Sequence, residues 1–251
     1  MSKTAGIIQA RMGSSRLPGK VLKEIAGKPM LQHMVERTRK VQQIDQVIIA
    51  TTEAPLDDPI EAFCEEFGCS IYRGSVHDVL DRYYQTAQKF QVENIVRLTA
   101  DCPLLDPLVV AKTISAFLDR KVDFAANRLP PPFKRTYPIG LDTEVCSFKA
   151  LEQAWREAKE KFEREHVMPY LYRVEGRFKT LVIDYEIDYG SWRLTVDTPE
   201  DLDLIRKIFD HFGDRPFNWL NVIHYLENHP EIAQINANIQ HKTVFDVDHR
   251  G

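Results

Sequence analysis

The most constraining feature of the sequence is the alternation of short apolar runs with longer helix-like segments along the first half of the chain. Residues 46–51 form a β-branched run typical of a strand, and residues 30–41 carry apolar side chains at helical spacing. The expected strands are residues 7–9, 46–51, 70–72, 94–99 and 122–126, and the expected helices are residues 30–41, 57–67, 77–90 and 107–118. Because parallel strands need long, usually helical connections, this order predicts an α/β fold with a mostly parallel sheet and helices on both faces.

The second half of the chain has less regular patterns. The expected strands there are residues 142–146, 178–183 and 192–196, and the expected helices are residues 147–159, 162–173, 198–212 and 218–227. Pro169 interrupts the second of these helices, and Thr198 followed by Pro199 is typical of a helix start. Because no internal repeat or low-complexity stretch is present, we treat residues 1–240 as one domain and residues 241–251 as a polar tail.

The charge balance limits the class of partner. The chain has 33 Lys and Arg against 37 Asp and Glu, a net charge of −4, whereas proteins that hold duplex DNA usually carry a basic excess. No stretch reaches the ~20 apolar residues needed to span a bilayer, and the N-terminal apolar run is too short for a signal peptide. We therefore expect a cytoplasmic protein without a nucleic-acid or membrane partner. The four cysteines form no C-x-x-C pair and are interpreted as small buried hydrophobic residues.

Residues 1–30 depart from this balance, with six basic residues and one acidic residue. This excess is either chance surface charge or a site for an anion such as phosphate. The loop that follows the first expected strand contains the residues best suited to bind an anion, which are Arg11, Gly13, Ser14, Arg16 and Lys20. Loop glycines let backbone N–H groups approach an anion closely. One Arg guanidinium can bind two phosphate oxygens at once, and Lys supplies a mobile charge. The loop is neither a Walker A loop nor a dinucleotide fingerprint, so it predicts phosphate binding of another kind.

Two carboxylates follow expected strands. Asp101 comes directly after one strand, and Asp197 lies between another strand and a helix start. The carboxyl ends of parallel strands meet at one edge of a sheet, which is where ligands bind. Carboxylate oxygens are ligands that Mg²⁺ prefers, so the pair predicts a Mg²⁺ site beside the phosphate loop. Asp106 precedes a proline and a helix and is interpreted as an N-cap.

Together with several further motifs, these segments resemble the sugar-acid cytidylyltransferases, which include the CMP-3-deoxy-manno-octulosonate and CMP-acylneuraminate synthetases. The family opens with a strand and an A-R-x-G-S-x-R-x-x-x-K loop, which is present here as residues 10–20. The other segments that carry the resemblance are residues 73–83, 101–103, 140–145, 164–167 and 196–201. The match spans about residues 5–210 and is closest to the branch of spore coat polysaccharide biosynthesis protein F.

The resemblance implies a Rossmann-like, GT-A-like nucleotidyltransferase fold, a three-layer sandwich with a small inserted dimerisation and acceptor segment. It also implies an enzyme that transfers CMP from CTP to a sugar or sugar acid and releases pyrophosphate, with Mg²⁺ as cofactor, in surface polysaccharide synthesis. Residues 1–127 are then the nucleotide-binding half, residues 128–190 the inserted segment, and residues 191–240 the part with the second metal ligand. Because family members are commonly homodimers, the resemblance implies a homodimer.

The resemblance further implies roles for individual residues. The residues implied to bind the nucleotide are Ala10, Arg11, Gly13, Ser14, Arg16, Lys20, Arg73, Ser75, Asp81 and Arg82, the last four near the base and ribose. Asp101 and Asp197 are the implied metal ligands. The predicted catalytic residues are Arg11, Arg16, Lys20 and Asp101. The three cations among them would stabilise the negative charge that builds up on the departing pyrophosphate.

Four residues fall where the acceptor pocket is expected. Arg135 follows a proline run and is either a solvated loop residue or a ligand for an acceptor carboxylate. Asp142 and Glu144 alternate on an expected strand, so they are either a charge pair on an edge strand or ligands for sugar hydroxyls. His166 is either part of a surface helix or a sugar contact. Because these stretches differ from the better-known sugar-acid enzymes, the acceptor sugar is not identified.

Two other functions fit parts of the pattern. A glycosyltransferase that uses a nucleotide sugar has a related sheet, but such enzymes usually carry an Asp-x-Asp motif where this chain has Asp101-Cys102-Pro103. A regulator that binds nucleotide without catalysis is the second alternative. The complete set of loop cations and strand-end carboxylates argues against such a regulator.

Overall fold

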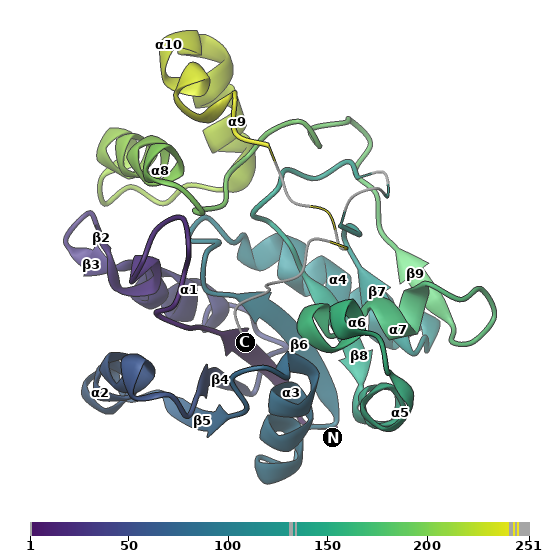
Figure 1. The fold of residues 1–251 in the computed structure, drawn as a ribbon. Helices are drawn as coiled ribbons and strands as arrows, with labels where there is room; N and C mark the ends of the chain where they lie inside the picture. The colour runs from purple at the N-terminus through teal and green to yellow at the C-terminus, as the bar shows by residue number, and fades with distance from the viewer. Residues whose placement is uncertain (1, 131–132, 134, 241–242, 244, 246–251) are drawn as a thin grey trace.

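A seven-stranded sheet lies at the centre of the computed structural model, which describes residues 2–130, 133, 135–240, 243 and 245 (Figure 1). The strands across the sheet are, in order, β5 (Ser70–Gly74), β4 (Gln46–Thr52), β1 (Thr4–Gln9), β6 (Asn94–Thr99), β8 (Glu144–Ser147), β7 (Phe124–Ala126) and β9 (Thr180–Val182). Neighbouring strands are parallel except for β8, which is antiparallel to both β6 and β7. The prediction of a mostly parallel sheet is therefore confirmed.

Helices cover both faces of this sheet. The helices on one face are α1 (Met30–Thr38), α2 (Asp58–Phe67) and α4 (Pro107–Arg120). The helices on the other face are α3 (Val79–Lys89), α5 (Phe148–Glu157) and α7 (Pro169–Tyr172), with α6 (Lys161–His166) beside them. Ile7 and Ile48 belong to the core of one face, and Ile8 and Ile49 to the core of the other. Because successive strand residues point to opposite faces, strands that are apolar at both positions are buried on both sides, and the predicted three layers result.

The place of β8 in the sheet differs from its place in the sequence. β8 lies between β6 and β7, and Val145 pairs with Val96 on one side and with Ala125 on the other. The connection from β7 to β8 contains no helix among the residues that the structure describes. A connection without a crossover helix joins antiparallel neighbours, whereas parallel neighbours need a long crossover. The sequence pattern predicts these strands but not the insertion of one between the other two.

The predicted strand at residues 192–196 is wrong. Arg193 forms one isolated parallel bridge with Ile139. Leu194 N donates a hydrogen bond to Ile139 O at 2.7 Å, whereas Val196 N donates one to Asp101 O at 2.8 Å. The stretch is extended, but its partners are divided between two segments, so it joins no ladder. Its alternating apolar side chains are buried in a separate core, which explains the strand-like pattern.

This separate core packs the C-terminal helices against the end of the sheet. Its helices are α8 (Pro199–Phe212), α9 (Trp219–Asn228) and α10 (Pro230–Ala233). Figure 1 shows α8 next to the small hairpin of β2 (Glu24–Ile25) and β3 (Lys28–Pro29), which the sequence analysis did not predict. Three short 3-10 helices complete the described elements: η1 (Lys20–Leu22), η2 (Pro55–Asp57) and η3 (Gln234–Asn236). Within the described part of the chain, no helix is both long and apolar enough to cross a membrane.

The predicted helix starts are confirmed. The Thr198 hydroxyl accepts a hydrogen bond from Asp201 N, and the Asp201 carboxylate accepts one from Thr198 N, which forms a capping box at the start of α8. Asp106 accepts a hydrogen bond from Leu108 N at 2.8 Å and caps α4. The predicted break at Pro169 separates α6 from α7. Helix boundaries were predictable because caps and prolines act on the residues beside them.

The four cysteines are free thiols. Three of them are buried, as predicted, whereas Cys69 is half-buried in the turn between α2 and β5. Arg39 Nη2 lies 3.6 Å from the Cys69 sulfur. A hydrogen bond from Cys64 and the positive charge of Arg39 outweigh burial and lower the pKa of Cys69 to about 7. Cys69 therefore departs from the predicted role of a purely apolar filler.

Candidate active site

A cavity of about 310 Å³ opens at the carboxyl ends of β1 and β6. Its lining comes from the loop after β1, from the turn after β6, from the start of β8 and from the segment before α8. Ligand pockets in proteins have volumes of roughly 300–1,000 Å³, so the cavity is large enough for a small molecule. It lies at the edge of the sheet where α/β proteins bind their ligands.

The loop after β1 is folded by its own backbone. Ser14 N and Gly19 N both donate hydrogen bonds to Met12 O at 2.9 Å, and Met12 N donates to Asp57 at 2.7 Å. Gly19 has a φ of +69°, a left-handed conformation that favours glycine. This turn starts η1 at Lys20 and directs its side chain back to the strand ends.

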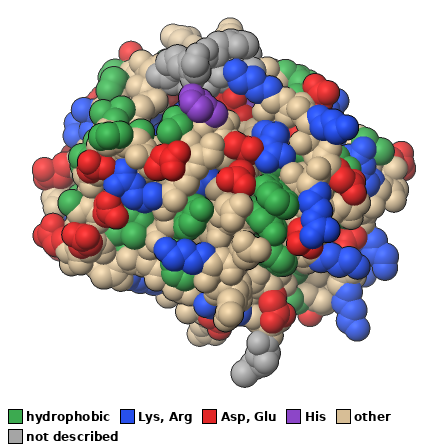
Figure 2. Space-filling model, turned by 60° about the horizontal axis from the view of Figure 1, so that its bottom comes forward, with side chains coloured by type: hydrophobic (Ala, Val, Ile, Leu, Met, Phe, Trp, Pro, Cys, Tyr) green, Lys and Arg blue, Asp and Glu red, His purple; other side chains and the backbone are tan. Residues whose placement is uncertain are grey.

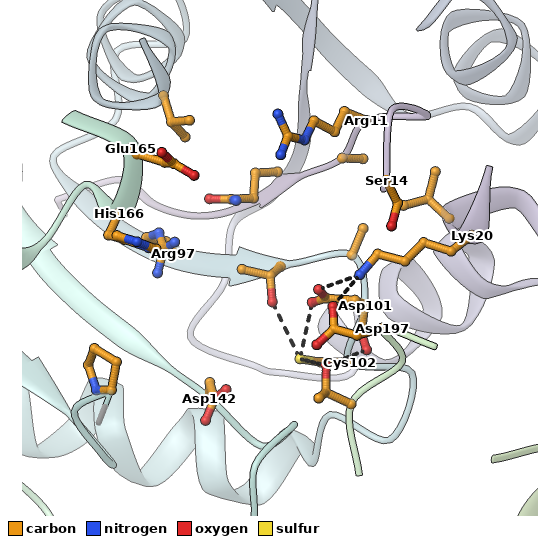
Figure 3. Close-up of a pocket in the computed structure, with 18 of the residues that line it drawn as sticks. Arg11, Ser14, Lys20, Arg97, Asp101, Cys102, Asp142, Glu165, His166 and Asp197 are labelled. Atoms are coloured by element: carbon orange, nitrogen blue, oxygen red, sulfur yellow. Dashed lines mark hydrogen bonds and ion pairs between the residues drawn. The ribbon is translucent and has the colours of Figure 1, made fainter. Parts of the chain in front are cut away.

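Lys20 lies at the centre of a charged cluster from three segments that are distant in the sequence (Figure 3). Its Nζ donates hydrogen bonds to Asp101 Oδ2 at 2.9 Å, to Asp197 Oδ1 at 2.9 Å and to Val196 O at 2.8 Å. Arg16 Nη2 lies 3.0 Å from the second oxygen of Asp197. Two of the predicted loop cations, Lys20 and Arg16, therefore lie in direct contact with the predicted metal ligands.

Both partners in this cluster keep their charge at neutral pH. Burial by itself would lower the pKa of Lys20, but the carboxylates of Asp101 and Asp197 outweigh it and the pKa is raised. Burial would raise the pKa of Asp197, but Lys20, Arg16 and Arg193 hold it well below its usual value. In this cluster Lys20 is therefore an ammonium and Asp197 an ionised carboxylate.

The basic excess of residues 1–30 is divided between the site and the surface. Arg16 and Lys20 lie in the cavity, whereas Lys28 pairs with Glu36 at 2.9 Å outside it. Figure 2 shows basic and acidic side chains interspersed over one face of the molecule. The excess is thus divided, with cations of the loop at the cavity and Lys28 outside it.

A buried network that the sequence analysis missed holds Asp197 in place. Arg193 donates to Asp197 Oδ2 at 2.8 Å and binds both oxygens of Asp201 at 2.9 Å. Asp201 is fully buried and also accepts hydrogen bonds from Asp197 N at 2.9 Å and from Asn236 at 2.8 Å. A signal was present in the spacing, because Arg193 and Asp201 lie four residues before and after Asp197.

Ion-paired arginines line the opposite end of the cavity. Arg97 pairs with Glu144, and Arg128 pairs with Asp142. Figure 3 shows His166 beside Arg97 and far from the charged cluster around Lys20. Neither arginine was predicted from the sequence, although a charged residue inside a buried strand, as Arg97 is in β6, indicates a special environment.

Several buried polar atoms of cavity-lining residues have no hydrogen-bond partner among the described residues. They are Gln9 Oε1, Arg82 Nε, Arg97 Nε and the Tyr172 hydroxyl. Burial lowers the pKa of Arg82 to about 10. Because a buried polar group without a partner is costly, these atoms favour a polar ligand that supplies the partners.

Most of the residues predicted for the site line this one cavity. They are Ala10, Arg11, Ser14, Arg16, Lys20, Arg82, Asp101, Asp142, Glu144, His166 and Asp197. The predicted residues outside the lining are Gly13, Arg73, Ser75, Asp81 and Arg135. Arg73 pairs with Asp58 at 2.7 Å, Ser75 accepts a hydrogen bond from Asp78 N at 3.0 Å, and Asp81 accepts one from Trp155 at 2.8 Å. The first contact joins β5 to the start of α2, and the other two shape the loop before α3 and the packing of α3 itself.

Arg135 has an unusual environment. Its exposed fraction is 8%, so the interpretation as a solvated loop residue is wrong. Neither Nη1 nor Nη2 has a hydrogen-bond partner among the described residues. Burial, together with the charge of Arg128, lowers the pKa of Arg135 to about 10. The charges of Arg128 and Asp142 act on the guanidinium, so it lies near the end of the cavity that these two residues line.

Two residues of the predicted polar tail are described, and one belongs to the site. Thr243 lines the cavity, and Phe245 packs edge-on against Phe162, with ring centroids 5.6 Å apart. The rest of the predicted tail lies outside the described residues.

Asp101 and Asp197 fit a hard cation, because their oxygens already converge on one cation, the Lys20 ammonium. Among the described residues there is no group of three or more His, Cys, Asp or Glu that could hold a metal ion by itself. Mg²⁺ usually takes one or two carboxylates and completes its shell with water and substrate phosphates. The two carboxylates therefore suit a Mg²⁺ ion whose other ligands are water and the oxygens of a bound phosphate compound.

Comparison with known proteins agrees with this geometry. The cytidylyltransferase family matches residues 5–243 of the chain. Spore coat polysaccharide biosynthesis protein SpsF of Bacillus subtilis is 33% identical over 241 residues, which cover 90% of this chain and 95% of that protein. The structure of a cytidylyltransferase from Leptospira borgpetersenii has a TM-score of 0.88 and 33% identity, and the match covers 96% of this chain and 100% of that one.

A more distant structure shows the same fold. It is that of a CMP-2-keto-3-deoxy-manno-octonic acid synthetase complexed with CTP, with a TM-score of 0.63 and 22% identity over 84% of this chain and 99% of that one. This likeness supports the predicted nucleotidyltransferase sandwich. From its fold, its site and its match over nearly the whole chain, the protein belongs to the cytidylyltransferase family.

Proposed function

We propose that the protein transfers CMP from CTP to a sugar acid, with release of pyrophosphate, in the synthesis of surface polysaccharide precursors. The observation that carries the proposal is the cavity at the sheet edge, where loop cations and two carboxylates face an acceptor end lined by polar groups. The names of the relatives support the substrates, since one acts in polysaccharide biosynthesis and another is a sugar-acid synthetase complexed with CTP.

Arg11, Arg16 and Lys20 are the proposed ligands of the triphosphate, with Ala10 and Ser14 in the same loop beside them. Arg82 is proposed near the base and ribose, where a nucleotide oxygen would satisfy its buried Nε. A hydroxyl oxygen of the sugar attacks the α-phosphorus, the bond to the β-phosphate oxygen breaks, and the hydroxyl proton passes to solvent. Such a reaction depends on positioning and on charge stabilisation, which fixed cations near the leaving group provide.

Asp101 and Asp197 are the residues proposed to hold Mg²⁺. The ion would neutralise phosphate charge and polarise a phosphoryl oxygen when bound. Arg193 and Asp201 would keep the Asp197 carboxylate oriented. Both are buried, and Arg193 donates hydrogen bonds to both carboxylate oxygens of Asp201.

The acceptor is proposed to bind at the end of the cavity formed by Asp142, Glu144 and His166. The carboxylates of Asp142 and Glu144 are held by Arg128 and Arg97, which leaves them oriented acceptors for sugar hydroxyls. Arg135 does not line the cavity, but its two terminal nitrogens are buried without a partner among the described residues and are affected by Arg128 and Asp142, so it is the proposed partner of the acceptor carboxylate.

We further propose a homodimer that forms through residues 128–190. Val174, Val182 and Ile187 in this segment are large hydrophobic side chains with 47%, 38% and 57% exposure, which a second subunit would cover. Size-exclusion chromatography with light scattering tests this proposal. A cytoplasmic site of action is also proposed, because the free thiols suit a reducing compartment.

The first test is thermal unfolding with Mg²⁺ and each of CTP, UTP, GTP and ATP, followed by pyrophosphate release with a panel of sugar acids. A ligand at 100 times its dissociation constant stabilises a protein by ~2.7 kcal/mol, so CTP should raise the melting temperature visibly. A shift selective for CTP, together with pyrophosphate release that is lost in Asp101→Asn, supports the proposal. Transfer from a nucleotide sugar without CTP consumption would identify a glycosyltransferase, and nucleotide binding without pyrophosphate release would indicate a regulator.

A further inference from the structure

Lys20 occupies the position that the proposed function assigns to a metal ion. The three hydrogens of its ammonium group are used on three oxygen atoms, which belong to Asp101, Asp197 and the Val196 carbonyl, at 2.8–2.9 Å. The ammonium therefore takes an oxygen from each of the two proposed metal ligands. A divalent cation would compete with the ammonium for these oxygens, because the two cations would lie a few ångströms apart and repel each other in a partly buried site.

We propose that Lys20 closes the metal site of the free enzyme, and that the triphosphate of the nucleotide opens it by drawing Lys20 and Arg16 onto its phosphate oxygens. The proposal rests on the proposed function for the identity of the triphosphate. Its consequence is an order of binding in which the metal site becomes accessible only when nucleotide phosphates have arrived.

The charges around the two carboxylates support this order. Asp101 and Asp197 are contacted by three cationic side chains, Lys20, Arg16 and Arg193, and Arg193 is also paired with Asp201, so three cations balance three carboxylates. A metal ion that approaches alone finds both carboxylates already paired with cations, whereas a nucleotide triphosphate brings negative charge that Lys20 and Arg16 can bind. The free site thus selects the phosphate compound before the metal.

The three cations differ in their freedom to move. Arg193 is bound through two nitrogens to the fully buried Asp201, so it stays on Asp197. Lys20 and Arg16 belong to the loop and to η1, and the Arg16 side chain is 32% exposed. A Lys side chain is a compact charge on a flexible four-carbon stem, so its transfer from carboxylate to phosphate needs only rotation about side-chain bonds.

The test is Mn²⁺ binding to the full-length enzyme without nucleotide, measured by the loss of the electron paramagnetic resonance signal of free Mn²⁺. We expect Lys20→Met to bind Mn²⁺ about tenfold or more tightly than the wild type, because the closed state no longer competes. Lys28→Met is the matched control, since it removes the same charge from an ion pair with Glu36 outside the cavity. It should leave the wild-type affinity unchanged, and adding Asp101→Asn to Lys20→Met should abolish the gain.

Equal Mn²⁺ affinity of the wild type and Lys20→Met, including undetectable binding in both, would overturn the proposal. Circular dichroism melting curves show whether the variant is folded. A measurement on the wild type alone covers the case of an unfolded variant: CTP should bind in excess chelator, as measured by calorimetry, and binding only after Mn²⁺ addition would refute the exchange. If the wild type and Lys20→Met bind Mn²⁺ equally and the wild type releases pyrophosphate, the proposed function holds, but Lys20 does not close the metal site. A Mn²⁺ gain in an inactive enzyme would leave the exchange standing without the proposed function.

Discussion

Asp197 is the residue on which the charges of the site converge. One of its oxygens faces Lys20 and the other faces Arg16 and Arg193, at 2.8–3.0 Å. Its backbone N–H donates to Asp201, which also fixes Arg193. The carboxylate is thus oriented before any ligand binds, and this preorganisation is what makes fixed charges effective in catalysis.

Removal of Arg16 should separate catalysis from folding. We expect Arg16→Ala to lower kcat about 10²–10³-fold, because loss of one group that stabilises developing charge typically costs ~3–4 kcal/mol. The fold should persist, since Asp197 keeps Lys20 and Arg193 as partners. Pyrophosphate release kinetics and a urea unfolding curve measure the two effects.

Arg156→Ala is the matched control for this substitution. Arg156 pairs with Glu152 one helical turn away on the surface of α5, and such exposed pairs contribute little. It should keep the wild-type kcat and stability. An Arg16→Ala enzyme with near-normal kcat would remove the proposed role of Arg16 at the phosphates.

At the scale of elements, the segment before α8 reaches the site through a close backbone contact. Gly140 has a φ of +105°, and a Cβ built there would lie 2.6 Å from the Leu194 carbonyl carbon and 2.7 Å from Thr195 N. This contact stands next to the bridge between Ile139 and Arg193, so it sets the position of the stretch that ends at Asp197.

Gly140→Ala should therefore destabilise the protein by roughly 2–4 kcal/mol, from unfavourable backbone conformation and from overpacking. It should also lower turnover, because the backbone that must shift is the one that carries Asp197. Gly27→Ala is the matched control, since Gly27 has a φ of +76° with no atom within 4 Å of a built Cβ. Urea unfolding should give a smaller loss for Gly27→Ala, and equal losses would show that the close contact is unimportant.

For the whole molecule, the charged cluster connects parts of the chain that belong to different packing units. Lys20 lies near the N-terminus, Asp101 follows a central strand, and Asp197 and Asp201 precede or begin a helix of the separate C-terminal core. Paired carboxylates with lowered pKa values make the stability of such an assembly depend on pH.

Acid should destabilise the protein through Asp197 and Asp201. Their pKa values lie below the usual 3.8 in the folded state, because cationic partners and hydrogen bonds outweigh the effect of burial. The unfolded chain then binds more protons than the folded protein. The contribution of the two carboxylates to the free energy of unfolding is therefore complete above about pH 5 and is lost as the pH falls through and below 3.8. Urea unfolding from pH 6 to pH 3 should show a steeper fall for the wild type than for Asp197→Asn. Parallel slopes would contradict the assignment.

Local patterns determined much of the architecture. The sequence predicts the strand β6 from its apolar residues and the start of α8 from the Thr198 cap. Both predictions succeed because strands and caps depend on residues adjacent in the chain. The loop of residues 10–20 and its cations were readable for the same reason, since all its members lie in one segment that ends in η1. The alternation of strands and helices was sufficient to predict three layers and the edge at which the site lies.

Only the tertiary structure decided which distant groups meet. The insertion of β8 between β6 and β7, and the divided partners of residues 192–196, follow from pairing between segments far apart in the chain. The same holds for the contacts of Lys20 with Asp101 and Asp197, because a local pattern records which charges exist but not which of them share a buried space. Burial makes those pairings strong, and burial is a property of the closed fold rather than of any one segment.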